Sequence, residues 1–262
     1  MVRIVIPRAR LPPVSPQVAP AAAAGPQAQI QLDADEAGYL TRVRRLRSGD
    51  PVEVFDGLGG RCAATVGPGL ETLLLGASLP DSSPRRFSFE LWPALTKGDK
   101  VEWVIQKATE LGLARLVPLV AERSVVKLAG ERAVARVARF RKIAQEAARQ
   151  CGRADVPEVT APAGLADFGA LAQAGVTAAL VYERETRHGL AELWESVPDG
   201  GRVAFAIGPE GGFSTAEVAL ALGAGARPVG LGDLILRAET AAIAVCTLAA
   251  AAAGALGPPR DR

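Results

Sequence analysis

Histidine and cysteine are scarce in this chain, and their scarcity narrows the chemistry that it can perform. The 262 residues include one histidine, His188, and three cysteines that lie far apart, at positions 62, 151 and 246. A single histidine argues against a histidine-based triad. The cysteine spacing fits neither a zinc site nor a disulfide framework, so we expect no metal cofactor. Unpaired cysteines favour a reducing compartment, which predicts a cytoplasmic protein.

Long hydrophobic runs and a strong net charge are also missing. The first seven residues lack the long apolar core of a signal peptide. The alanine-rich run 241–256 is shorter than the ~20 residues that a bilayer requires, so we expect no association with a membrane. The formal net charge is only +2, so any surface for nucleic acid has to be local. Hydrophobic residues make up 49% of the chain, which is typical of a globular protein.

The pattern of residues 1–80 predicts a small β-rich domain. Short strands are expected at 52–55, 62–66 and 73–75, and the turn Asp56-Gly57-Leu58-Gly59-Gly60 predicts a hairpin between the first two. The segment 15–27 is rich in proline and alanine and predicts a poorly ordered loop. The segment 80–84 predicts a linker.

Strands and helices alternate over residues 85–257, which predicts a separate α/β domain. Alternation of this kind is typical of a parallel sheet that helices cover on both faces. The expected strands are 87–94, 116–120, 178–182, 203–207 and 228–231. The expected helices are 100–111, 131–150, 215–222 and 239–253.

Two turns near the C-terminus indicate a ligand pocket that is built largely of backbone. Gly208-Pro209-Glu210-Gly211-Gly212 follows an apolar strand, and Leu236-Arg237-Ala238-Glu239-Thr240-Ala241 opens a helix. Glycine turns bring bare backbone up to a ligand. The first turn lacks the Lys-Ser/Thr of a phosphate loop and carries Glu210, which would repel a phosphate. A neutral or cationic cofactor fits better, and S-adenosylmethionine is a sulfonium cation without a phosphate.

Arginine supplies most of the positive charge and gathers in two clusters. One cluster lies on a face of the expected helix 131–150. Each cluster alone is typical of a solvated surface. Together, on two domains of a nearly neutral chain, they predict a local surface for nucleic acid. The other cluster, in the first domain, consists of Arg42, Arg44, Arg45 and Arg47.

Several segments of the chain match a known family of enzymes in order. They are Lys97–Gly112, Glu122–Ser124, Glu146–Pro157, Ile207–Phe213 and Leu231–Ala241, with Tyr39–Asp50 and Val54–Gly57 in the first domain. In these segments the chain resembles the RsmE family of small-subunit (16S) ribosomal RNA uridine-N3 methyltransferases, of the SPOUT class. The resemblance covers almost the whole chain, and G-P-E-G-G followed by L-R-x-E-T-A is a specific signal. One departure is Asp233-Leu234, where the family usually has Pro-Arg, and the sequence does not tell what this replacement costs.

This resemblance implies a fold, a cofactor and an oligomeric state. The fold would be α/β, with an N-terminal PUA-like β-barrel that binds RNA (residues 1–80). A SPOUT-type methyltransferase domain (residues 85–257) would follow, and its C-terminal segment would form a trefoil knot. The protein would bind S-adenosylmethionine without a metal. It would act as a homodimer, through its knot helices, on small-subunit ribosomal RNA or on an assembly intermediate of that subunit.

The resemblance also assigns roles to particular residues. Arg237 would stabilise the uracil anion that forms as N3 loses its proton, and Glu239 would hold Arg237 or accept that proton. Arg123 and Arg153 would contact RNA, as would the arginine cluster of the first domain. The cofactor would be bound by Leu180, Glu183, Gly208, Pro209, Glu210, Gly211, Gly212, Leu231, Gly232, Ile235, Leu236 and Ala238.

Two other functions stay open at this point. One is a knotted methyltransferase that acts on transfer RNA or on a ribose 2′-hydroxyl. The other is a noncatalytic RNA-binding protein of ribosome assembly, although both C-terminal turns are retained and argue against it. The sequence does not give the modified nucleotide, the general base, or whether the substrate is naked RNA or an assembled subunit.

Overall fold

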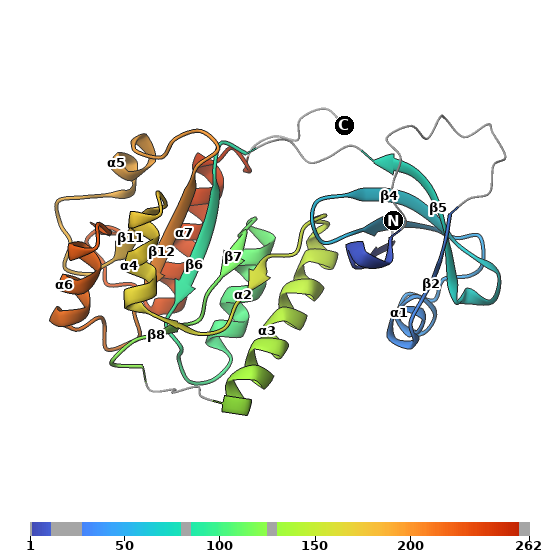
Figure 1. The fold of residues 1–262 in the computed structure, drawn as a ribbon, viewed down its shortest axis with the longest axis horizontal. Coiled ribbons are helices and arrows are strands. Elements are labelled where there is room, and N and C mark those ends of the chain that lie inside the picture. The colour runs from blue at the N-terminus through green and yellow to red at the C-terminus, as the bar shows by residue number, and fades with distance from the viewer. Residues whose placement is uncertain (1, 12–27, 80–84, 125–129, 257–262) are drawn as a thin grey trace. The chain divides into compact units, whose positions relative to one another are not determined.

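The computed structural model describes residues 2–11, 28–79, 85–124 and 130–256 (Figure 1). Contacts within the chain define two compact units. The first unit comprises residues 1–83 together with 148–156, and the second comprises residues 84–147 and 157–262. The predicted loop 15–27 and the predicted linker 80–84 lie outside the described residues.

A five-stranded sheet forms the first unit. Its strands follow the order β1-β3-β4-β5-β2, in which β1 is parallel to β3 and the other pairs are antiparallel. The strands are β1 (Val2–Val5), β2 (Gln29–Gln31), β3 (Pro51–Phe55), β4 (Arg61–Val66) and β5 (Thr72–Leu79). The short helices are η1 (Arg8–Arg10), α1 (Ala34–Gly38), η2 (Tyr39–Val43) and η3 (Pro68–Leu70).

The predicted hairpin is present between β3 and β4, and Asp56 holds its turn. The carboxylate of Asp56 accepts hydrogen bonds from the backbone N–H groups of Leu58 and Gly60, both at 2.8 Å. Gly57 has φ of +79°, a conformation that glycine adopts without steric cost. Buried hydrophobic residues from all five strands form the core of this unit.

A six-stranded sheet forms the centre of the second unit, in the order β13-β11-β12-β6-β7-β9. Every pairing in it is parallel, as the sequence predicted. The strand predicted at 116–120 is two short strands instead, because Pro118 has no N–H to donate to a ladder. The strands of this unit are β6 (Ser88–Pro93), β7 (Arg115–Leu116), β8 (Leu119–Val120), β9 (Glu158–Val159), β10 (Ala163–Gly164), β11 (Thr177–Val181), β12 (Arg202–Ile207) and β13 (Arg227–Val229).

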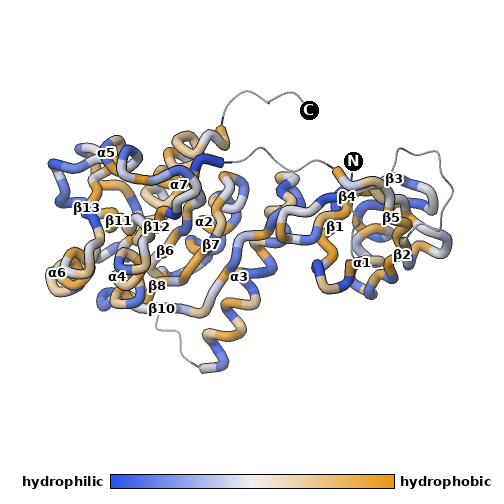
Figure 2. The backbone as a smooth tube through the Cα atoms, turned by 45° about the horizontal axis from the view of Figure 1, so that its top comes forward, coloured by the Kyte–Doolittle hydropathy of each residue, from blue (hydrophilic) through white to orange (hydrophobic). Residues whose placement is uncertain are grey.

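Helices cover both faces of this sheet. Helix α7 packs on β6 and β12 with α2 beside it, and α4 packs on β11 with α6 beside it (Figure 1). Figure 2 shows hydrophobic residues along the central strands, as expected for a sheet buried on both faces. The helices are α2 (Lys100–Glu110), α3 (Gly130–Cys151), α4 (Leu165–Gln173), α5 (Leu190–Glu195), α6 (Thr215–Gly223) and α7 (Ala238–Ala252). Within the described ranges, no helix is long and apolar enough to cross a membrane.

The topology brings three chain segments to one edge of the parallel sheet. Strands β13, β11 and β12 are neighbours, so their carboxyl ends lie at the same edge. The segments that follow them begin at Tyr182, Gly208 and Gly230. Ligands of open α/β sheets bind at the carboxyl ends of the strands, which makes this edge the place to look for a site.

Candidate active site

A cavity of about 450 Å³ lies at this edge of the sheet. The first cavity loop, residues 208–212 after β12, forms one wall. The second cavity loop, residues 230–237 after β13, forms another wall. Side chains that follow β11 and the first turn of α7 complete the lining. Three loops that are distant in sequence therefore share one cavity.

All the residues predicted to bind a cofactor line this cavity except Leu180. Leu180 is completely buried in the core that includes Phe168 of α4, because its position in β11 points it into that core. The prediction for Leu180 is therefore corrected. The sequence missed several other lining residues, which flank the predicted ones: Val181, Tyr182, Glu185, Gly230, Asp233 and Leu234.

The first cavity loop is held in place by its own chain. Gly212 has φ of +65°, and its backbone N–H donates to the carbonyl of Pro209 at 2.8 Å. The guanidinium of Arg123 donates to the carbonyl of Gly211 at 2.8 Å. A Cβ at Gly208 would lie 3.3 Å from the ring of Phe213, so the turn has little room for a side chain there.

The second cavity loop is held only near its ends. Gly230 donates its backbone N–H to the carbonyl of His188 at 2.9 Å, and the carbonyl of Arg237 accepts from α7 at 2.8 Å. Between these points, in the part of the chain that the structure describes, residues 231–236 make no hydrogen bond. Leu234 and Ile235 are 79% and 84% exposed.

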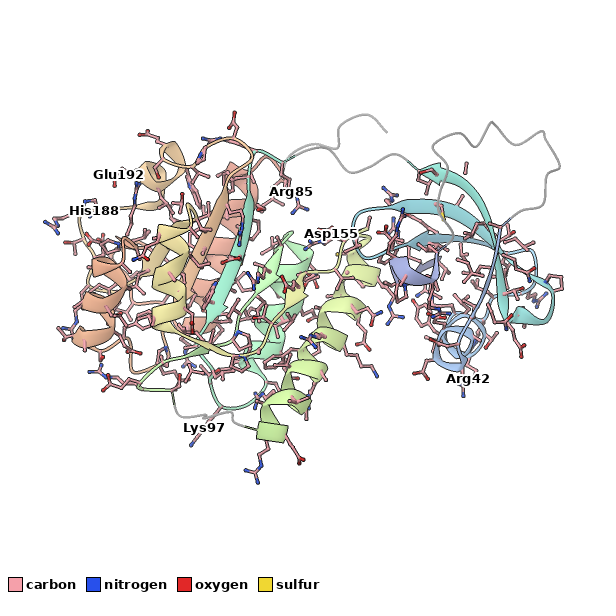
Figure 3. All side chains as sticks on the ribbon, viewed as in Figure 1. Arg42, Arg85, Lys97, Asp155, His188 and Glu192 are labelled. Atoms are coloured by element: carbon pink, nitrogen blue, oxygen red, sulfur yellow. The ribbon has the colours of Figure 1, made fainter. Side chains whose placement is uncertain are left out.

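The cavity carries more negative than positive charge. Of the described residues that line it, Arg237 is the only basic one. The carboxylate of Glu185 accepts hydrogen bonds from the backbone N–H groups of Arg187 and His188, which hold its pKa below the ordinary value. His188 and Glu192, both labelled in Figure 3, line another cavity together. The acidic lining residues are Glu183, Glu185, Glu210 and Asp233.

Arg237 and Glu239 are not brought together as predicted. Arg237 is the N-cap residue of α7, is exposed, and makes no side-chain hydrogen bond or ion pair within the described residues. Glu239 lies outside the main cavity, and its carboxylate faces Lys100 of α2, with Nζ and Oε1 3.7 Å apart. The Arg237–Glu239 contact is therefore replaced by a Lys100–Glu239 contact, which the sequence did not predict. The only feature of the sequence that could have pointed to this contact is that Lys100 lies within a segment that matches the family.

Of the arginines predicted to contact RNA, two are bonded within the protein and four are not. Arg153 has a side chain only 8% exposed and forms a bidentate ion pair with Asp155, so it is corrected to a structural role. Arg123 is exposed but bonded to the first cavity loop. The remaining four are exposed, with no side-chain hydrogen bond or ion pair to any described residue, and Arg42 is labelled in Figure 3: Arg42, Arg44, Arg45 and Arg47.

No group of three or more His, Cys, Asp or Glu side chains is placed to hold a metal ion anywhere in the described ranges. The groups that the cavity offers to a ligand are its backbone walls, its carboxylates and Arg237.

Comparisons with known proteins agree over most of the chain. A family model for an RNA methyltransferase domain matches residues 83–250, and one for an RNA methyltransferase PUA domain matches residues 32–70. The ribosomal RNA small subunit methyltransferase E of Bacillus subtilis is 32% identical over 219 residues, which are 81% of this chain and 86% of that protein.

Two solved structures have the same fold. A Legionella pneumophila protein assigned as a methyltransferase, in complex with the bound cofactor S-adenosylmethionine, superposes with a TM-score of 0.79 and 28% identity, over 96% of this chain and 97% of that one. A ribosomal RNA small subunit methyltransferase E of Neisseria gonorrhoeae superposes with a TM-score of 0.76 and 24% identity, over 95% and 96% of the two chains.

The fold and both family matches define an RNA methyltransferase in which a PUA-like domain precedes a SPOUT-type α/β domain. This confirms the predicted fold class, whereas the trefoil knot stays a prediction. The sequence identity to the Bacillus subtilis protein, and the share of both chains that it covers, also show the family. The chain belongs to the ribosomal RNA small subunit methyltransferase E (RsmE) family.

Proposed function

We propose that this protein transfers a methyl group from S-adenosylmethionine to N3 of a uridine in small-subunit ribosomal RNA. The observation that carries the proposal is the acidic, backbone-walled cavity with Arg237 in its second loop, in a chain of the RsmE family. The Bacillus subtilis relative is named as a methyltransferase of small-subunit ribosomal RNA, and the Legionella relative binds S-adenosylmethionine. A ribosomal RNA substrate also favours the cytoplasm as the place of action.

The cavity fits this cofactor in size, charge and lining. Its volume of about 450 Å³ lies within the range of roughly 300–1,000 Å³ that is typical of small-molecule sites. Of the four carboxylates that line the cavity, Glu210 is paired with Lys100; the other three, against one guanidinium, suit a sulfonium cation and would repel a phosphate. The available backbone groups of the second cavity loop would hold the adenine edge against the wall that the first cavity loop forms, and Glu183 lies beside them. When bound, the cofactor supplies an electrophilic methyl group.

Arg237 is the residue that we assign to the uracil. N3 has to lose its proton before its lone pair can accept a methyl group. A guanidinium beside the uracil carbonyls stabilises the resulting anion, and its planar fork can donate to two acceptors. Arg237 is exposed, and its donors are not engaged by any described side chain or carbonyl. We propose that the proton leaves to water and that Glu239 acts through Lys100 rather than on the uracil.

The surface that we propose for RNA is the arginine cluster of the first unit. Its four exposed guanidinium groups keep their donors available for phosphate oxygens. We assign Arg123 instead to the first cavity loop, because it donates to the carbonyl of Gly211.

We also propose that the protein acts as a homodimer through α7. This helix carries small residues over most of its length, which permits close packing with a second helix. Leu248 on α7 is 46% exposed, although it is a large hydrophobic residue. Light scattering on the purified protein measures the oligomeric state, and a monomer at micromolar concentration would contradict this proposal.

Methylation of defined RNA substrates tests the proposed function. The purified protein is incubated with isotopically labelled S-adenosylmethionine and small-subunit RNA, assembled small subunits or transfer RNA. The nucleosides are then identified by mass spectrometry. We expect N3-methyluridine from a small-subunit substrate. A 2′-O-methylated nucleoside, or methylation of transfer RNA alone, would support the other knotted enzymes. Absence of both methylation and cofactor binding would support a noncatalytic assembly protein.

A further inference from the structure

Lys100 occupies an unusual place for a basic residue. It is the first residue of α2, where the helix dipole and the free N–H groups disfavour a positive charge. Lysine at this position needs a compensating partner. Two carboxylates meet its ammonium group: Glu210 accepts a hydrogen bond from Nζ, and Glu239 Oε1 lies 3.7 Å from Nζ.

The two carboxylates come from the two sides of the cavity. Glu210 belongs to the first cavity loop, and Glu239 belongs to the first turn of α7, two residues after Arg237. One ammonium group on α2 therefore connects both elements. Its hydrogen bond with Glu210 raises the pKa of Lys100 and lowers the pKa of Glu210, so both groups are charged at neutral pH.

Glu239 has little other use in the structure. Its side chain is 18% exposed, and its Oε2 atom is buried without a hydrogen bond to any described residue. The space beside it, about 10 Å³ for the centre of a water molecule, has room for about one water, so a nucleotide base cannot reach Glu239 from that side. Among the described residues, the basic side chain that Glu239 contacts is that of Lys100.

Helix α2 is itself held against α3, which gives Lys100 a fixed base. Arg136 donates to the carbonyl of Gly98 at 3.2 Å, just before α2 begins. Arg139 donates to Glu102 at 2.6 Å, in the first turn of α2. Two arginines of the cluster predicted on this helix, Arg136 and Arg139, therefore hold the end of α2 that carries Lys100.

We propose that Lys100 is a positioning residue, which ties the first cavity loop to the first turn of α7 through Glu210 and Glu239 and so sets the position of Arg237. This inference rests on the proposed function, because Lys100 affects the methylation rate only by positioning Arg237. Lys100 itself does not line the main cavity. The competing role for a partly exposed lysine is a direct contact with an RNA phosphate.

The test compares Lys100→Met, Lys100→Arg and the control Lys97→Met, which removes an exposed positive charge from the preceding loop. Methionine keeps the length and apolar stem of lysine without the charge. We expect Lys100→Met to lower kcat for methylation by ~10- to 100-fold, the scale for a small misplacement of a catalytic group. The KM for RNA should stay unchanged, Lys100→Arg should regain most of the rate, and Lys97→Met should match the parent.

A second pair of variants identifies the partners of Lys100. Glu210→Gln alters an exposed side chain, so it should fold even where Lys100→Met does not. We expect it to lower kcat in the same direction. Lys100→Met combined with Glu239→Gln should be no slower than Lys100→Met alone, since Lys100→Met already removes the contact that Glu239→Gln would remove.

The outcomes separate this inference from the proposed function. A raised KM for RNA with unchanged kcat in Lys100→Met would mean a phosphate contact and overturn the inference. Parent-like rates in both Lys100→Met and Glu210→Gln would overturn it as well. If the parent protein methylates nothing, hydrogen exchange still decides. Lys100→Met should speed exchange of the hydrogen-bonded amides of Gly212 and Ala241, on the two sides of the tie, and unchanged exchange would refute the tie.

Discussion

The two cavity loops are held in opposite ways. Arg123, Lys100 and an internal turn hold the first loop, at Gly211, Glu210 and Gly212. The second loop makes no described hydrogen bond over residues 231–236. One wall of the cavity is therefore fixed before any ligand arrives, and the other has its polar groups available.

The arginines divide in the same way. Arg153 is buried in an ion pair, and Arg123 holds a loop, whereas Arg237 and the cluster of the first unit form no side-chain hydrogen bond or ion pair with any described residue. Arginine side chains that are bonded within the protein hold the site in shape. Arginine side chains without such bonds can contact RNA or cofactor. The predictions below test this division.

Removing Arg237 should have the largest effect. We expect Arg237→Ala to lower the methylation rate by ~100-fold or more, the usual scale for losing a donor to a developing anion. Cofactor affinity, measured by calorimetry, should change little. Arg237→Lys should recover part of the rate, because an ammonium group cannot present a planar fork.

A rise in pH should partly restore the rate of Arg237→Ala, since more uracil is then already deprotonated. A parallel loss of cofactor affinity in Arg237→Ala would contradict the catalytic assignment and leave Arg237 as part of the cofactor wall.

Gly230, where the second loop leaves β13, should tolerate no side chain. A Cβ at this position would collide with the backbone carbonyl of Glu185. We expect Gly230→Ala to lower the free energy of unfolding by ~1–3 kcal/mol, the scale of an overpacked site, as measured in urea. Gly223→Ala is the matched control, because a Cβ there meets no atom within 4 Å. Equal stability of the two variants would show that the loop can move at its base.

The arginine cluster should act on RNA alone. Changing Arg42, Arg44 and Arg45 to alanine should weaken RNA binding by ~10-fold or more and flatten its dependence on salt, because fewer phosphate contacts release fewer counterions. Binding measured at several salt concentrations gives the slope. Cofactor affinity should be unaffected, and an unchanged slope would mark the cluster as plain surface.

Glu185 should give the smallest effect, and one that depends on pH. Hydrogen bonds from Arg187 and His188 hold its folded-state pKa below the ordinary value of 4.5. A lowered carboxyl pKa stabilises the fold above pH ~4.5, and this stability is lost as the pH falls through the folded-state value. Glu185→Gln should therefore melt slightly below the parent at pH 7, with the difference shrinking under acidic conditions. A difference that grows on acidification would contradict this assignment.

Local patterns predicted the long elements of the fold well. The helix predicted at 131–150 is Gly130–Cys151, and the one predicted at 239–253 is Ala238–Ala252. The short elements α4 and α5 were missed, because a few turns of helix give too little periodicity to distinguish from a loop. Helix η2 was missed too, since five residues are too few for a helical period to show.

The site was predictable where it is built of backbone. Glycine turns after strands identify a cavity wall from sequence, because few other residues permit the backbone to approach a ligand. Contacts between distant side chains carry no such local pattern. Lys100 lies over a hundred residues from its partners. Arg153 and Asp155 are only two residues apart, but the sequence does not show that the fold buries the side chain of Arg153.

Hydrogen–deuterium exchange with and without S-adenosylmethionine tests the central claim most directly, namely that the cofactor binds between a fixed wall and an available one. The account predicts that exchange in residues 231–236 is fast in the free protein and slows when the cofactor is added, whereas exchange in residues 208–212 changes little. Unchanged exchange in 231–236, or slowing confined to 208–212, would contradict it.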